Sequence, residues 1–80
     1  MVKERPVTHR EFTAVLKHLG FKPRPQNGTS HVHWVKEAGG GIQKVTVDEH
    51  NSPYHRRMLK LMMAQAGLSK KDFFELLEQV

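Results

Sequence analysis

The sequence predicts an α+β fold in which a three-stranded antiparallel sheet carries helices on one face. Apolar residues recur at helical spacing near both ends of the chain, whereas short β-branched segments joined by turn residues fill the middle. These middle segments alternate apolar and polar residues, which is typical of a sheet with one buried and one open face. The expected order is helix, three strands, helix and a short C-terminal helix, in a single domain over residues 1–80.

A capping box marks the start of the first helix. Thr8 and Glu11 have the spacing at which a hydroxyl and a carboxylate each accept from a backbone N–H of the first turn. Val7 precedes the box and is expected to pack on Phe12 as a hydrophobic staple. Gly20 is the expected left-handed cap at the other end. The apolar stripe between these signals consists of Phe12, Val15, Leu16 and Leu19.

Residues 21–26 are expected to form an edge strand. Pro23 and Pro25 lie two residues apart, so both of their missing N–H groups fall on the same side of the strand. The alternate residues remain available to pair on the other side. An edge position tolerates this pattern and a central position does not. Asn27-Gly28 then provides a turn.

Two further strands are expected at residues 30–36 and 42–47, joined by the flexible turn 37–41. In the earlier strand Val32 and Trp34 share one face, so His31 and His33 share the other. Val45 and Val47 of the later strand face one way, while Lys44 and Thr46 face the other. If the valines and the tryptophan face the helices, the histidines lie on the open face of the sheet.

Ser52-Pro53 predicts the start of the second helix, with serine as the N-cap and proline in the first helical position. Tyr54 is then expected to be exposed beside basic residues. Gly67 ends this helix, and its apolar stripe is formed by Leu59, Met62, Met63 and Ala66. A last helix begins at Ser69, with Asp72 three residues later and Leu68 expected to pack on Phe73.

Composition narrows the classes of function. Thirteen Lys and Arg against eight Asp and Glu leave a formal charge of +5, which favours a polyanionic partner such as nucleic acid. The chain has no cysteine, so disulfides, thiolate chemistry and cysteine-based zinc sites are excluded. It has no apolar run of membrane-spanning length and no N-terminal secretory pattern, so we expect a cytoplasmic protein without a membrane partner.

The paired histidines have three interpretations: ordinary surface residues, metal ligands or catalytic groups. The side-chain pKa of histidine lies near 6.5, so an exposed imidazole can accept or donate a proton close to neutral pH. In the metal interpretation, His31, His33 and His50 supply three imidazoles and Asp48 completes a zinc shell. Strand spacing does not enforce tetrahedral geometry, however, and we expect no cofactor.

Several short motifs resemble those of the HicA-type (YcfA-like) toxins. Gly28-Thr29-Ser30-His31 followed by Trp34 is similar to the Gly-Ser-His motif and aromatic residue of that family. The similarity continues through residues 45–47, His50, Leu59 and 66–69, and covers roughly residues 8–77. It implies a double-stranded-RNA-binding-domain-like fold and a ribosome-independent mRNA interferase. It also implies neutralisation by a HicB-type antitoxin in a hetero-oligomer.

Carried over residue by residue, the resemblance makes His31 the catalytic histidine. It would act as general base on the RNA 2′-hydroxyl or as general acid on the leaving 5′-oxygen, and the sequence leaves both roles open. The auxiliary candidates are His33, His50 and Ser30. The residues expected to contact RNA are Lys22, Arg24, Gly28, Lys36, Lys44, Arg56 and Arg57. The alternatives are a module of this fold that binds RNA without cutting it and an inactive relative that only binds an antitoxin.

The chain departs from the family pattern at two places. Asp48 stands where the family usually has proline after the valine of the third strand. Arg57-Met58 stands where a Gly-Thr pair is common before the leucine of the next helix. Both departures leave the fold prediction unchanged and fall on the edge that would contact RNA.

Overall fold

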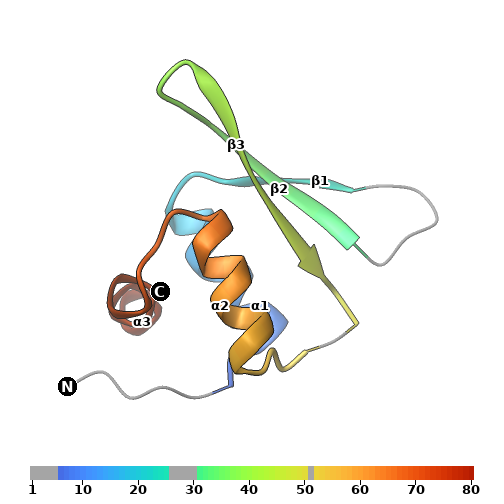
Figure 1. Ribbon diagram of the computed structural model, residues 1–80, viewed down its shortest axis with the longest axis vertical. Coiled ribbons are helices and arrows are strands. Elements are labelled where there is room, and N and C mark those ends of the chain that lie inside the picture. Colours follow the sequence, from blue (N-terminus) through green and yellow to red (C-terminus); the bar gives the residue numbers. More distant parts are fainter. Residues whose placement is uncertain (1–5, 26–30, 51) are drawn as a thin grey trace.

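The structure is a computed structural model that describes residues 6–25, 31–50 and 52–80. Its elements are α1 (His9–His18), β1 (Lys22–Pro25), β2 (His31–Ala38), β3 (Gly41–Asp48), α2 (Arg56–Gln65) and α3 (Lys70–Gln79). The strands form one antiparallel sheet in the order β1-β2-β3, and the helices lie to one side of it (Figure 1). The predicted α+β class and element order are confirmed. The layout is compatible with a double-stranded-RNA-binding-domain-like fold.

The helix ends follow the predicted local chemistry. The capping box of α1 is complete, with Thr8 Oγ1 accepting from the Glu11 N–H and Glu11 accepting from the Thr8 N–H. Gly20 adopts a φ of +95°, and the N–H of Phe21 donates to the carbonyl of Leu16 at 2.9 Å. This is the Schellman arrangement, in which a left-handed residue lets the chain leave the helix with its last carbonyls paired.

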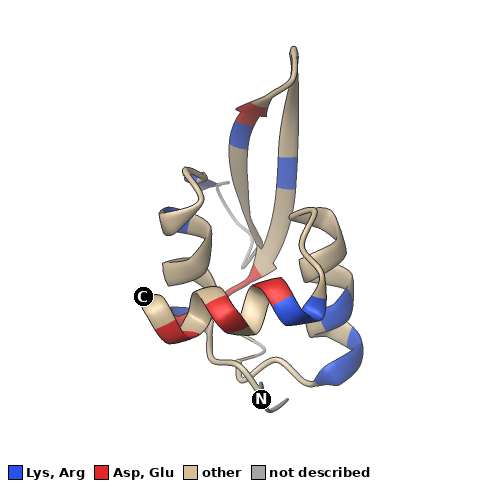
Figure 2. Cartoon of the chain, turned by 90° about the vertical axis from the view of Figure 1, so that its left-hand side faces the viewer, with Lys and Arg blue, Asp and Glu red and all other residues tan. Residues whose placement is uncertain are grey.

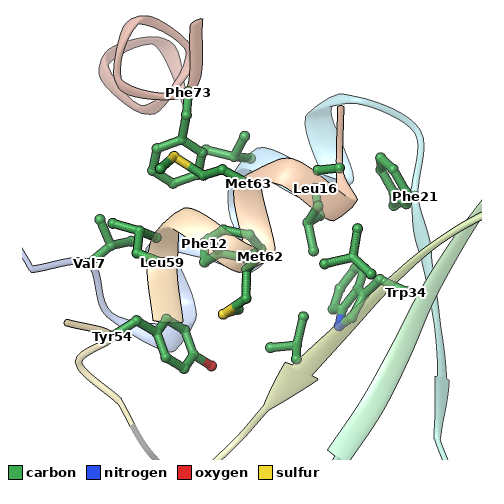
Figure 3. Close-up of a cluster of buried hydrophobic side chains, with 14 of the residues drawn as sticks. Val7, Phe12, Leu16, Phe21, Trp34, Tyr54, Leu59, Met62, Met63 and Phe73 are labelled. Atoms are coloured by element: carbon green, nitrogen blue, oxygen red, sulfur yellow. The ribbon is translucent and has the colours of Figure 1, made fainter. Parts of the chain in front are cut away.

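The core lies between the helices and the inner face of the sheet (Figure 3). Phe12 of α1 stacks on Phe73 of α3 with 5.2 Å between ring centroids. Trp34 is 5% exposed, as the alternation of β2 predicts. The sheet contributes Val32, Trp34, Val45 and Val47 to this core, and α2 contributes Leu59, Met62, Met63 and the cap residue Ala66.

The β2–β3 hairpin projects beyond the short strand β1 (Figure 1). Its turn consists of Gly39 and Gly40, which have φ values of +57° and +84°. Two consecutive residues with positive φ give the turn a twist that matches the paired strands, which is why glycine suits both positions. The predicted edge position of β1, with its alternate prolines, is confirmed.

The predicted start of the second helix is wrong. The helix begins at Arg56 with His55 as its N-cap, and Ser52 has another role. Ser52 Oγ accepts from the backbone N–H of His9 at 2.7 Å, so this hydroxyl caps the N-terminal end of α1 instead. Ser52 therefore contacts α1, and α2 begins four residues later, at Arg56.

The expected exposure of Tyr54 is also wrong, because its side chain is completely buried. Its backbone pairs with Val7 in an isolated antiparallel bridge, in which the Tyr54 N–H donates to the Val7 carbonyl at 2.7 Å. This bridge draws the ring beneath α1, where it meets Phe12 edge to face at 6.1 Å. None of the helices in the described ranges is long and apolar enough to cross a membrane.

Candidate functional site

The strand register places five of the predicted site residues on the face of the sheet opposite the helices. Arg24 of β1 pairs with His33 of β2, which pairs with Thr46 of β3. Directly paired residues point to the same face of a sheet. We call the following set the outer face: Lys22, Arg24, His31, His33, Val35, Lys44 and Thr46. Its three cationic side chains are exposed and come from the two strands that flank the histidines.

His31 lies at the first position of β2, with 51% of its side chain accessible to solvent. Its cross-strand partner is Asp48, the last residue of β3. The distance from His31 Nε2 to Asp48 Oδ2 is 3.8 Å, and only 9% of the Asp48 side chain is accessible. The site therefore combines an accessible imidazole with a carboxylate that is largely shielded from water.

Hydrogen bonds among the described residues hold both the side chain and the backbone of Asp48. Asp48 Oδ1 accepts from the backbone N–H of His50 at 2.9 Å, and the Asp48 carbonyl accepts from the Tyr54 hydroxyl at 2.5 Å. The same hydroxyl lies 3.1 Å from His9 Nδ1. Burial, followed by the negative charges of Asp48 and Glu49, raises the pKa of Tyr54 to about 12. The tyrosine therefore remains a neutral donor at physiological pH.

His33 is half-buried and is engaged within the sheet. Its Nδ1 atom lies 3.1 Å from Thr46 Oγ1, a hydrogen bond whose direction depends on the imidazole tautomer. The backbone N–H of Thr46 donates to Gln65 Oε1 of α2 at 2.9 Å. The imidazole of His33 is thus positioned by a strand that is itself fixed to a helix.

Not all the predicted RNA contacts gather at this face. Lys36 shares the parity of Val32 and Trp34, and its Nζ atom lies 4.9 Å from the ring centroid of Phe21. His50 is exposed two residues beyond the end of β3, next to the site. Gly28 and Ser30 lie outside the described residues.

Arg56 and Arg57 are the first two residues of α2, are exposed and do not belong to the outer face. Arg56 lines a pocket between α2 and α3 together with Lys60 and Lys70. Figure 2 shows this second basic region as blue segments along α2 and at the start of α3. The described residues therefore form two separate cationic surfaces, and only the outer face includes His31.

Among residues 6–25, 31–50 and 52–80, no group of three or more His, Cys, Asp or Glu side chains lies close enough to hold a metal ion. Within these ranges the imidazole of His31 lies 3.8 Å from the carboxylate of Asp48. The sequence suggested Asp48 as a zinc ligand and as a departure from the family pattern, but not as the partner of His31. The signal that would have found it is the register that pairs the start of β2 with the end of β3.

Comparison with known proteins identifies a family for this chain. The family model described as the HicA toxin of bacterial toxin-antitoxin systems matches residues 9–68, which run from the start of α1 to just past α2. No curated protein and no solved structure matches the chain. The matched segment contains all of the outer face and Asp48.

Proposed function

The chain belongs to the HicA toxin family of bacterial toxin–antitoxin systems, and we propose that it acts as a ribosome-independent endoribonuclease that cleaves mRNA. A toxin of such a pair has a cognate antitoxin, and we propose that this partner is of the HicB type. The observation that supports the activity is the position of His31. It is an accessible imidazole on the sheet face opposite the described helices, with exposed cations on both neighbouring strands.

Charge and shape support a single-stranded RNA substrate. Lys22 and Arg24 on one side and Lys44 on the other can contact successive phosphates of a strand that runs over the face. The one tyrosine of the chain is buried, so base stacking on Tyr54 is not part of the proposal. Binding then depends mainly on contacts between cations and phosphates.

The proposed reaction needs proton transfer and no redox chemistry. The 2′-oxygen gives up its proton and bonds to the adjacent phosphorus while the bond from phosphorus to the 5′-oxygen breaks. The leaving 5′-oxygen takes up a proton, so the products carry a 2′,3′-cyclic phosphate and a 5′-hydroxyl. His31 is the proposed acid–base group, and such a group contributes about 10²–10⁴-fold to the rate.

The auxiliary residues have smaller proposed roles. His33 already contacts Thr46, so we assign it to binding a phosphate rather than to carrying a proton. His50 lies beside the site and is proposed to contact the RNA backbone. Ser30 and Gly28 precede His31 in the chain and are proposed to act with it on the same phosphate.

A cleavage assay with matched histidine variants tests the proposal. Purified chain is incubated with a single-stranded RNA in EDTA, alongside His31→Ala and the control His18→Ala, which changes a histidine in the last turn of α1. We expect His31→Ala to cut about 10²–10⁴-fold more slowly and His18→Ala to match the parent chain. An RNA with a 2′-deoxyribose at the cut position is expected to resist cleavage, and added antitoxin is expected to stop the reaction.

Each contrary outcome identifies a different function. RNA that is bound but remains intact with the parent chain indicates a binding module. Cleavage that disappears only when EDTA is present indicates a metal-dependent nuclease. Equal rates for His31→Ala and the parent chain would remove His31 from the mechanism.

A further inference from the structure

We propose that Asp48 is the positioning residue for His31 and fixes it as the general base of the reaction. The general-base role depends on the proposed RNA cleavage, whereas the pairing of Asp48 with His31 does not. The carboxylate faces Nε2 of the imidazole, so the neutral ring carries its proton there and presents the lone pair of Nδ1 to the RNA 2′-hydroxyl.

The geometry places the two groups together through the backbone. His31 and Asp48 are direct partners in the register of β2 and β3, and the Nε2 to Oδ2 distance is 3.8 Å. A histidine and a carboxylate at this separation in an unliganded site can close to hydrogen-bond distance when substrate binds. The carboxylate is 9% accessible and the imidazole 51%, so the anion is held inside while the ring reaches outward.

Asp48 is held through both its side chain and its backbone. The His50 N–H donates to Oδ1, and Oδ2 is the oxygen 3.8 Å from the imidazole Nε2. The hydroxyl of Tyr54 fixes the carbonyl of the same residue, and Tyr54 is anchored to Val7 by its backbone bridge. Asp48 is therefore attached to the N-terminal end of the helical layer as well as to the sheet.

The other charged or titratable side chains near the site contact different groups from the His31 imidazole. Glu49, the adjacent carboxylate, faces α1, where its Oε2 lies 3.8 Å from His9 Nε2. His33 on the same strand contacts Thr46, and Arg24 on β1 is the cross-strand partner of His33. Glu49 therefore provides a control that removes one negative charge at the neighbouring position.

The proton balance of the step is simple. The proton of the 2′-hydroxyl moves to Nδ1 of His31 as the oxygen bonds to phosphorus, and the bond to the 5′-oxygen breaks. Water supplies the proton to the leaving 5′-oxygen, and the imidazolium later returns its extra proton to solvent. Asp48 stays ionised throughout, and its charge stabilises the imidazolium that forms beside it.

Proline, the residue expected at position 48 from the family pattern, can be introduced into this chain as a test. The Thr46 N–H donates to Gln65, away from β2, and residues two apart on a strand direct their N–H groups to the same side. The Asp48 N–H therefore also points away from β2. Proline at this position removes the carboxylate without removing a hydrogen bond of the β2–β3 ladder.

The first test separates chemistry from binding. Single-turnover cleavage is measured over a range of protein concentrations for Asp48→Asn, Asp48→Pro and the control Glu49→Gln. We expect the maximal rate to fall at least about tenfold in both Asp48 variants while the half-saturating concentration changes less than about twofold. Glu49→Gln is expected to match the parent chain in both quantities.

The second test does not require activity. Nitrogen-15 NMR of the imidazole, assigned with His31→Ala, reports which ring nitrogen carries the proton. In Asp48→Asn the amide oxygen can keep the His50 N–H, so the amide NH₂ faces Nε2 and is expected to shift the ring to the Nδ1–H tautomer. Glu49→Gln is expected to leave the tautomer unchanged.

The two tests distinguish failure of this inference from failure of the proposed function. A tautomer and a maximal rate that are both unchanged in Asp48→Asn would overturn the positioning role. If the parent chain fails to cut RNA, the nuclease proposal is lost, and an unchanged tautomer in Asp48→Asn would then overturn the pairing independently. Should Asp48→Asn fail to fold, Asp48→Pro carries the rate measurement.

Discussion

The two faces of the β2–β3 hairpin are built from alternate residues of the same strands, yet their environments differ sharply. On the inner face Val32, Trp34, Val45 and Val47 are between 0% and 7% exposed. On the outer face half of the His31 side chain is accessible, and Arg24 and Lys44 are exposed. Because side chains alternate along a strand, neighbouring residues in the sequence serve different purposes.

This difference separates stability from function over most of the sheet. Substitutions on the inner face should change the free energy of unfolding, and those on the outer face should change RNA cleavage or binding. The end of β3 is the exception. Asp48 is buried like an inner residue but faces His31, and its carbonyl holds Tyr54 of the core.

The largest expected effect lies on the inner face. Trp34→Ala should lower the free energy of unfolding by about 3–5 kcal/mol, because it removes a large buried ring and leaves a cavity. Urea denaturation followed by far-ultraviolet circular dichroism measures the loss. Val35→Ala, the next residue and a half-buried member of the outer face, is the control and should cost less than about 1 kcal/mol. Similar losses in the two variants would contradict the separation of the faces.

The next largest effect concerns the end of β3, where the two faces meet. The pKa of Tyr54 is raised from 10.0 to about 12, so between these pH values the folded state holds a proton that the unfolded state has lost. This contribution is therefore fully present below about pH 10 and is lost as the pH rises to about 12. The loss corresponds to about 2–3 kcal/mol of unfolding free energy.

Because the chain has one tyrosine, near-ultraviolet absorbance of the tyrosinate follows this titration directly. Tyr54→Phe should remove the extra loss of stability in that pH window while other alkaline effects remain. A tyrosinate transition centred at pH 10 in the folded chain would show that the hydroxyl is not held by Asp48 and shielded from water.

Features that depend on local sequence were predicted well. The capping box at Thr8, the left-handed Gly20 and the edge position forced by Pro23 and Pro25 each depend on residues within a few positions of one another. The assignment of Trp34 to the core and His31 to the open face needed only strand alternation. These choices agree with one another, which is why the fold class could be derived.

Features that depend on distant pairing were missed. The bridge between Val7 and Tyr54 buries the tyrosine, and α2 begins only at Arg56. No short sequence motif predicts this bridge. Sequence reasoning grouped Lys36 with the RNA contacts by charge, although its parity places it with Trp34 on the inner face. The pairing of His31 with Asp48 required the exact strand register.

The smallest expected effect on stability concerns Lys44, an exposed cation of the outer face. Lys44→Ala should change the free energy of unfolding by less than about 0.5 kcal/mol, because its side chain is exposed. In a His31→Ala background, in which cleavage is expected to be slow, Lys44→Ala should weaken single-stranded RNA binding. The slope of log affinity against log salt should become shallower by about 0.7, the value for one lost phosphate contact on a single strand.

Lys17→Ala, at an exposed position in the last turn of α1, removes the same charge from the helical layer and should leave that slope unchanged. Equal slopes for the two variants would mean that the net charge of +5 attracts RNA without a defined path across the sheet.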